Sequence, residues 1–201
     1  MSTSRLEAFS DGVLAIIITV MVLELKVPGE PYTLHTLWHE SGLGLLTYLL
    51  SFVYIGIYWN NHHHMFQVCE RINGSVLWAN LSLLFVLSLY PFTTAWMDES
   101  RLARTPVVVY GVNLLAAGTA YFILQHFMAR VPGNEARMRE VFGRTGKEIA
   151  SILLYVVGIA LAFVEPWLAM VPYAAVALMW LVPDRRVERW LEARADADPA
   201  G

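Results

Sequence analysis

The sequence contains a single cysteine, Cys69, among its 201 residues. A disulfide within the chain and a metal cage built from cysteines are therefore excluded. Charged residues are also scarce, at 15% of the chain, against about 25% in soluble domains. The formal net charge of -3 supplies no broadly basic surface, which argues against a nucleic-acid partner.

The short motifs that mark common active sites are missing as well. The chain has no GxSxG elbow, Walker loop, HExxH zinc motif or dinucleotide fingerprint, and no TVGYG potassium filter. Three histidines follow one another at His62 to His64, but successive residues on a helix point about 100° apart and do not converge on one ion. We therefore expect no enzyme, no catalytic residue, no metal site and no cofactor.

What the chain has in excess is apolar sequence. Hydrophobic residues make up 57% of it, and the mean hydropathy is +0.49. Stretches without Asp, Glu, Lys or Arg run from Ser41 to Cys69, from Ile72 to Met97 and from Thr105 to Ala129. Each is long enough to cross a bilayer, which takes about 20 residues. A further span near the N-terminus takes in Asp11, and an acid inside a span indicates function by default.

The last apolar region, Ile149 to Pro183, carries one charge, Glu165, which Pro166 follows directly. Both residues would disrupt a single long helix in hydrocarbon, whereas a turn accommodates them. The sequence therefore predicts a hairpin there, and an all-α integral membrane protein with one six-helix domain and a tail over 183–201. The predicted helices cover about residues 6–25, 42–66, 74–97, 106–129, 149–164 and 167–182.

The positive charges predict the orientation of these helices. With six spans, eleven of the 14 Lys and Arg residues fall on one side, and this excess marks the cytoplasmic side. These residues are Arg5, Arg71, Arg130, Arg137, Arg139, Arg144, Lys147, Arg185, Arg186, Arg189 and Arg194. We therefore expect a multi-pass protein of the cell membrane with both termini in the cytoplasm. A re-entrant hairpin over 149–182 would also place the segments before and after it on the same side of the membrane, so it stays an alternative.

Polar residues gather at the cytoplasmic ends of the first two predicted helices. Arg5, Ser10 and Asp11 begin the first helix, and the segment from Trp59 to His64 ends the second. A carboxylate at this depth needs hydrogen-bond donors, which indole, imidazole and guanidinium groups supply. A hydrogen-bonded clamp between the two helices is the preferred interpretation, and proton transfer is the other. In the outer loop before the second helix, His35 and His39 are expected to lie in a solvated turn.

The segment from Arg5 to Asp11 reads RxxxFSD, and it resembles the signature of the transmembrane protein 175 family of lysosomal and prokaryotic potassium channels. The similarity continues through Trp59–His63 and through Pro91–Thr93, so residues 5–97 carry nearly all of it. This resemblance implies a channel whose pore is lined by the first helix, with a hydrophobic constriction in place of a carbonyl filter.

The resemblance also implies roles for individual residues. Ile16 would form the constriction, Thr19 would place a hydroxyl in the pore, and Val20 and Leu23 would extend the narrow layer. A structural polar network would join residues of the first two helices, namely Arg5, Phe9, Ser10, Asp11, Trp59, His62 and His63. A chain with one six-helix unit would assemble as a homotetramer in the bilayer and pass potassium ions with modest selectivity.

Other functions fit part of the same sequence. Asp11, the histidine cluster and the proline-interrupted hairpin are also typical of a proton-coupled secondary transporter. A proton-permeable leak channel and a noncatalytic membrane scaffold are further alternatives. Ion flux separates them, because a channel passes ions down either gradient, whereas a carrier saturates and couples.

Overall fold

The computed structural model describes residues 3–142 and 146–181, with side chains placed outside 139–145. These residues form eight α-helices and no strand. The helices are α1 (Thr3–Leu23), α2 (Leu34–Val68), α3 (Gly74–Leu87), α4 (Tyr90–Glu99), α5 (Arg104–Ala129), α6 (Glu135–Phe142), α7 (Gly146–Ala162) and α8 (Pro166–Leu181). The predicted tail over 183–201 lies outside the described residues.

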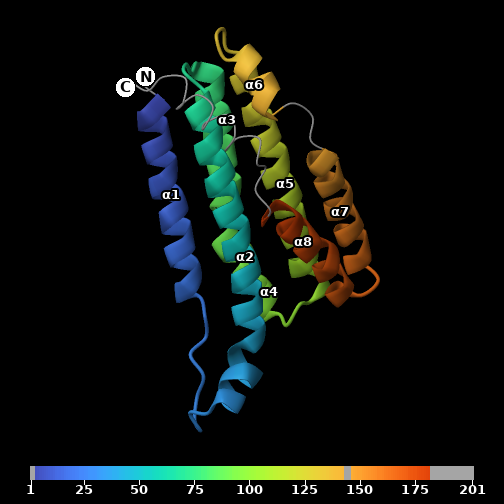
Figure 1. Ribbon diagram of the computed structural model, residues 1–201. Coiled ribbons are helices and arrows are strands. Elements are labelled where there is room, and N and C mark those ends of the chain that lie inside the picture. The colour runs from blue at the N-terminus through green and yellow to red at the C-terminus, as the bar shows by residue number, and fades with distance from the viewer. Residues whose placement is uncertain (1–2, 143–145, 182–201) are drawn as a thin grey trace.

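The long helices run up and down beside one another (Figure 1). α1 lies at one edge of the bundle, where it packs on α2, α3 and α4, and α7 lies at the other edge. The short α6 sits at the end of the bundle where α1 begins and where α2 and α5 finish, which we call the α6 end. The first turns of α2 and the loop before it project at the opposite end.

Four segments are long and apolar enough to cross a membrane by length and composition: α1, α2, α3 with α4, and α5. α7 and α8 have only 17 and 16 residues, which is fewer than the about 20 of a typical span. They pack on one another as a hairpin whose turn lies at residues 163–165, where the sequence placed it. The Glu165 side chain is exposed in that turn.

The third predicted span, residues 74–97, differs from the structure because it is divided into two helices. α3 ends at Leu87, and α4 begins at Tyr90 with Pro91 in its first turn. Pro91 has no N–H to donate to the Leu87 carbonyl, and its ring crowds the preceding turn. The α-helix is therefore interrupted by a turn at residues 88–89. In this turn the Ser88 hydroxyl donates to the Phe85 carbonyl at 2.7 Å.

The expectation of a solvated loop turn at His35 and His39 was wrong, because α2 already begins at Leu34. Thr33 caps this helix, and its hydroxyl oxygen accepts a hydrogen bond from the Thr36 backbone N–H at 3.1 Å. The two histidine rings stack with centroids 6.2 Å apart, as residues four apart on a helix do. The structure thus extends α2 about two turns beyond the predicted span.

The hairpin is held to the rest of the bundle by the buried ring of Tyr173. Two glycines, Gly111 on α5 and Gly158 on α7, leave space for this ring, and an added methyl group at either would overlap it. On the other side, the Tyr54 hydroxyl donates to the Tyr173 carbonyl at 2.6 Å. These contacts join α2, α5, α7 and α8 into one core.

The loop after α2 is fixed to the end of α5 by Asn134, which is fully buried. Its amide donates to the carbonyls of Arg71 at 2.9 Å and Met128 at 3.3 Å, and its oxygen accepts from the Glu70 backbone N–H at 3.2 Å. Glu70 also forms an ion pair with Arg137 on α6. The segment between α5 and α7 therefore contains a short docked helix, α6.

Candidate functional site

One face of α1 packs against the protein. Its buried residues follow a spacing of three and four, which is the period of a single helix face. They are Leu6, Ser10, Leu14, Ile17 and Met21. The opposite face is therefore exposed in the part of the chain that the structure describes.

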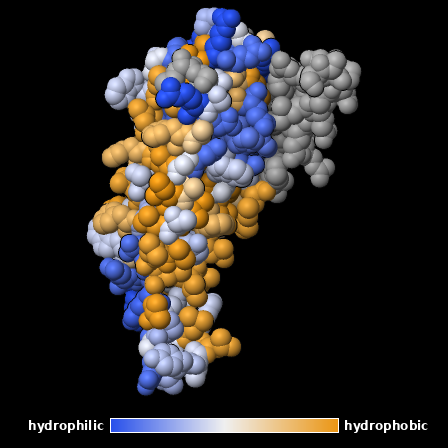
Figure 2. Space-filling view, turned by 90° about the vertical axis from the view of Figure 1, so that its left-hand side faces the viewer, coloured by the Kyte–Doolittle hydropathy of each residue, from blue (hydrophilic) through white to orange (hydrophobic). Residues whose placement is uncertain are grey.

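The exposed face of α1 is mostly apolar. Ile16 is 63% exposed and Leu23 is 80% exposed, and together with Phe9 at 52% they recur every seven residues. Val20 is 38% exposed beside them, and Thr19 is also exposed. Figure 2, which views the side of the molecule that carries α1, shows a broad hydrophobic band between hydrophilic ends. A contiguous apolar surface of this kind indicates contact with lipid or with other protein surfaces.

Thr19 is the polar group on this exposed face. Its hydroxyl donates within the helix, 2.9 Å from the Ile16 carbonyl and 3.1 Å from the Ala15 carbonyl. A hydroxyl has one hydrogen and two acceptor lone pairs. Because the hydrogen is turned back to the helix, the Thr19 oxygen keeps its lone pairs available to accept or to coordinate.

The buried side of α1 carries a polar connection to α2 and α3 centred on Asn80. The Asn80 amide donates to the Ser10 hydroxyl oxygen at 2.9 Å, and its oxygen lies 2.8 Å from Nε2 of His62. Ser10 in turn donates to the Leu6 carbonyl at 2.8 Å. Ser10 and Asn80 are fully buried, and His62 is 1% exposed.

This geometry fixes the protonation of His62. Since the Asn80 oxygen is an acceptor, Nε2 of His62 carries a proton and donates it. The other ring nitrogen, Nδ1, is buried without a hydrogen-bond partner among the described residues. A second proton at Nδ1 would be an unpaired buried donor on a charged ring, which is costly. His62 is therefore a neutral structural donor.

A second set of contacts lies nearer the surface at the α6 end. The Trp59 indole N–H donates to the Asp11 carboxylate at 3.1 Å, and the Trp59 ring stacks on His63. Nδ1 of His63 lies 2.8 Å from the Glu7 carboxylate, and Nε2 of His63 lies 2.8 Å from the Gln67 amide nitrogen. With Gln67 donating to Nε2, His63 donates from Nδ1 to Glu7.

The structure brings together five of the seven residues of the predicted network: Ser10, Asp11, Trp59, His62 and His63. Arg5 and Phe9 do not join them, because both point to the exposed side of α1. No hydrogen bond or ion pair of Arg5 occurs within the described residues.

The predicted network lacked three partners that the structure supplies, namely Glu7, Gln67 and Asn80. Glu7 lies one turn before Asp11 on the same side of α1, so the four-residue spacing could have found it. Asn80 could be recognised from sequence only as a polar residue inside a predicted span, of the kind that bonds across helices. Its two partners depend on how α3 packs against α1 and α2.

Together these contacts fix the rotation of α1 about its own axis. Ser10 is tied to α3 through Asn80, and Asp11 is tied to α2 through Trp59. Turning the helix would break both connections and bury the apolar face that Ile16 occupies. Among the described residues, no group of three His, Cys, Asp or Glu side chains is arranged to hold a metal ion.

This chain is similar to known proteins in both sequence and structure. The family model for the endosomal/lysosomal potassium channel TMEM175 matches residues 5–91. A potassium channel of Chryseobacterium sp. (strain P1-3) is 50% identical over 194 residues, which cover 96% of this chain and 99% of that relative. The crystal structure of a lysosomal potassium-selective channel TMEM175 homolog from Chamaesiphon minutus matches with a TM-score of 0.72 and 31% identity. That match covers 90% of this chain and 96% of the solved one.

A more distant relative carries a different functional name. The endosomal/lysosomal proton channel TMEM175 of Danio rerio is 29% identical over 119 residues. The match covers 58% of this chain but only 22% of that longer protein. The similarity to the Chryseobacterium relative, by contrast, extends over both chains almost completely.

Proposed function

This chain belongs to the TMEM175 family, and on that premise we propose that it is a potassium channel whose ion path is lined by α1 in a homotetramer. It is a multi-pass membrane protein of a channel family. The finer points of the proposal are the path along α1, the constriction at Ile16 and the assembly of four chains.

The observation that carries the proposal is the two-sided character of α1. One side is fixed to the protomer by buried contacts, and on the other side Ile16, Thr19 and Leu23 are exposed among the described residues. A helix at the edge of a bundle that exposes such a face is well suited to line a shared axis. Four copies related by a fourfold axis would bring four of these faces together, which one chain alone does not achieve.

In that assembly the four Ile16 side chains would form a ring of branched apolar groups. An apolar ring excludes water, so an ion crosses it only after losing part of its hydration. Potassium loses water at a lower cost than sodium, which gives a modest preference for potassium. The Thr19 oxygen lies about one turn further along the helix and would replace part of the lost hydration.

Val20 and Leu23 would extend the narrow zone toward the end opposite α6. The hydrogen-bonded contacts of Ser10, Asp11, Trp59, His62 and His63 would act as positioning groups for α1. In this role Asp11 holds the helix through Trp59 and does not carry protons.

The proposed orientation has both termini in the cytoplasm. The segment that joins α5 to α7 lies at the α6 end, and it carries several of the Lys and Arg residues that mark the predicted cytoplasmic side. This orientation needs an even number of crossings. In the proposed topology α7 and α8 bring the four long segments to six crossings as a short hairpin, and a re-entrant hairpin would also keep the number even. A helix of 17 residues is about 25 Å long, which is close to the about 30 Å of hydrocarbon that it would have to cross.

The test is ion flux through the purified protein in liposomes. We expect potassium to move down its gradient in either direction, without saturation and without coupling to a counter-ion, and to move faster than sodium. Flux that saturates and requires a proton gradient would support a proton-coupled transporter. Protein that assembles but conducts no ion would refute the proposal.

Proton permeation is the second candidate, and the name of the Danio rerio relative favours it. In this chain the titratable side chains Glu7, Asp11 and His63 lie near the α6 end of α1. A pH-sensitive dye inside liposomes without potassium, with a permeant anion present to compensate the charge of the moving protons, separates the two. Acidification driven by a proton gradient alone would establish proton flux, and a constant internal pH would exclude it.

A further inference from the structure

A cavity lies between α2 and α8, toward the end of the bundle opposite α6. The two helices are joined where the Tyr54 hydroxyl donates to the Tyr173 carbonyl at 2.6 Å, and a space of about 200 Å³ lies between their first halves. We call it the α8 cavity. One stripe of each helix supplies its main walls, namely Leu43, Leu46, Leu50, Trp167, Met170 and Ala174. α1 contributes no residue to it, so it is separate from the proposed ion path.

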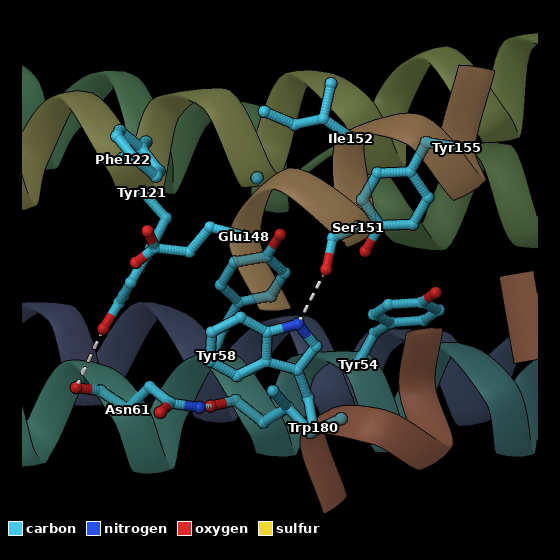
Figure 3. A pocket seen from close by; sticks show the side chains of 12 residues that line it. Tyr54, Tyr58, Asn61, Tyr121, Phe122, Glu148, Ser151, Ile152, Tyr155 and Trp180 are labelled. Atoms are coloured by element: carbon cyan, nitrogen blue, oxygen red, sulfur yellow. Dashed lines mark hydrogen bonds between the residues drawn. The ribbon is translucent and has the colours of Figure 1, made fainter. Parts of the chain in front are cut away.

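Closer to the α6 end, the helices around the hairpin leave much less space. Figure 3 shows that region, where the Trp180 indole N–H donates to the Ser151 hydroxyl at 2.8 Å and the Tyr121 hydroxyl donates to the Asn61 carbonyl at 3.2 Å. The hollow that remains there has about 50 Å³. The α8 cavity, by contrast, is larger than the roughly 150 Å³ of an apolar cavity that takes up benzene. It is therefore large enough to hold part of a hydrocarbon chain.

The α8 cavity is suited to hydrocarbon and not to water. Thr47 adds the only hydroxyl group of its walls, and this hydroxyl donates within its own helix, at 3.2 Å to the Leu43 carbonyl and at 3.1 Å to the Gly44 carbonyl. A buried water needs several polar partners, which these walls do not supply. Two wall residues, Leu46 and Trp167, are 49% and 56% exposed, so the cavity is reached from the surface that faces lipid.

The turn between α4 and α5 completes the cavity. Leu102 lines it from this turn and is only 3% exposed. Arg101 and Leu102 have φ angles of 50° and 58°, which residues other than glycine rarely adopt. Their backbone N–H groups donate at 2.9 Å to the carbonyls of Asp98 and Met97, and these bonds hold the turn. The turn thus buries Leu102 and leaves Arg101 and Arg104 exposed close to it in the chain.

The charges of these two arginines are not used by the described part of the chain. Neither guanidinium forms a hydrogen bond or an ion pair there. The carboxylate of Asp98 lies instead against Gly44 on α2, a residue that does not line the cavity. A guanidinium binds phosphate with two parallel hydrogen bonds. Trp167 at the start of α8 is typical of the depth at which lipid headgroups lie.

We propose that the α8 cavity binds one acyl chain of a phospholipid whose phosphate is bound by Arg101 and Arg104. The lipid belongs to the leaflet at the end opposite α6. Glu99 and Glu165 are exposed at the same end, and they leave this assignment unchanged because phosphate is common to anionic and zwitterionic headgroups. No part of the site lies on α1, so the lipid site and the proposed ion path are tested separately.

The probe is phosphatidylglycerol with a dibrominated acyl chain, and diacylglycerol with the same chains is its match without phosphate. Bromine quenches tryptophan fluorescence on contact, and Trp167 lines the cavity. Each lipid is titrated into the purified full chain in dodecyl maltoside. The signal is the quenching that occurs in the wild-type protein and is missing in Trp167→Phe. We expect saturable quenching, with half-saturation by phosphatidylglycerol at a mole fraction at least about tenfold lower than by diacylglycerol. Equal half-saturation by the two lipids, or no saturation, would overturn the proposal.

Two pairs of variants locate the site. Arg101→Gln combined with Arg104→Gln should remove the tenfold preference, whereas Arg130→Gln changes an exposed arginine at the other end of α5 and should keep it. Ala174→Leu fills part of the cavity and should weaken both lipids. Ala175→Leu adds the same side chain at the exposed neighbouring residue and should leave both affinities unchanged. Unchanged affinities in the arginine double variant and in Ala174→Leu would refute the site.

A second copy of this chain is the other occupant that the experiment separates. If it covers the cavity, Ala174→Leu should lower the mass of the oligomer in light scattering, and neither lipid should quench Trp167. That result would overturn the lipid site. If Ala174→Leu does not fold, the arginine double variant still decides the matter, because both of its side chains are exposed. A tenfold preference that persists in the double variant would refute the phosphate contact.

Discussion

Asn80→Ala tests whether the polar contacts hold α1 in place. Asn80 is fully buried and bridges Ser10 and His62 with bonds of 2.9 and 2.8 Å. Shortening it removes both bonds and leaves the Nε2–H of His62 without a partner. Side-chain hydrogen bonds between membrane helices average about 0.6 kcal/mol, and a buried donor left unpaired costs about 1–3 kcal/mol. We therefore expect Asn80→Ala to lower the free energy of unfolding by roughly 2–4 kcal/mol.

The assay is equilibrium unfolding in mixed dodecyl maltoside and SDS micelles, followed by tryptophan fluorescence. Ser82→Ala is the matched control, because Ser82 lies on the same helix, is exposed, and donates only to the Trp78 carbonyl of its own helix. It should change stability by less than about 0.5 kcal/mol. In a double-mutant cycle, Ser10→Ala should lower the free energy of unfolding by less in the Asn80→Ala variant than in the wild-type protein. If Asn80→Ala lowers the free energy of unfolding no more than Ser82→Ala does, the polar contacts of Asn80 do not hold α1 in place.

Three further predictions address other parts of the molecule. Gly111→Ala should lower the melting temperature because its methyl group overlaps the Tyr173 ring, and an unchanged melting temperature would show that the ring has room to move. Asp11→Asn should lower the yield of tetramer and the melting temperature by weakening the bond from Trp59, whereas normal assembly with selective loss of proton flux would contradict a structural role. Burial raises the pKa of the Cys69 thiol, just beyond the end of α2, to about 12. Since the thiolate is the reactive form, iodoacetamide at pH 8 should modify the native chain far more slowly than the unfolded chain, and equal rates would contradict this burial.

The sequence predicts the apolar helices well because a helix that crosses the hydrocarbon core needs about 20 residues that are mostly apolar and uncharged. Charge-free runs located the segments that became α2, α3 with α4, and α5, and the Glu165–Pro166 pair located the turn between α7 and α8. The division of the third span at Ser88 follows from the local effect of Pro91. The start of α2 at Leu34 did not follow from hydropathy, because a capped polar helix outside the apolar run carries no signal of that kind.

The family resemblance assigned pore roles to Ile16, Thr19 and Leu23, and those roles stay predictions. The structure places all three residues on the exposed side of α1, opposite Ser10 and Ile17. The partners of Ser10 and His63 depend on how neighbouring helices are rotated and how far they are shifted along each other. Single-helix periodicity contains neither quantity, which is why the bonds of Asn80 to Ser10 and His62 emerged only from the packed structure.

The central claim is that Ile16 forms the constriction of the ion path. Its most direct test is the reversal potential under mixed potassium and sodium gradients, measured on wild-type protein, Ile16→Ala and Ile123→Ala in liposomes. Ile123 is a matched control, because it is an exposed isoleucine, 46% accessible, on α5. We expect Ile16→Ala to raise the conductance and to move the reversal potential toward the value of a pore that does not distinguish potassium from sodium. Ile123→Ala should behave as wild type. An unchanged conductance and reversal potential in Ile16→Ala would contradict it.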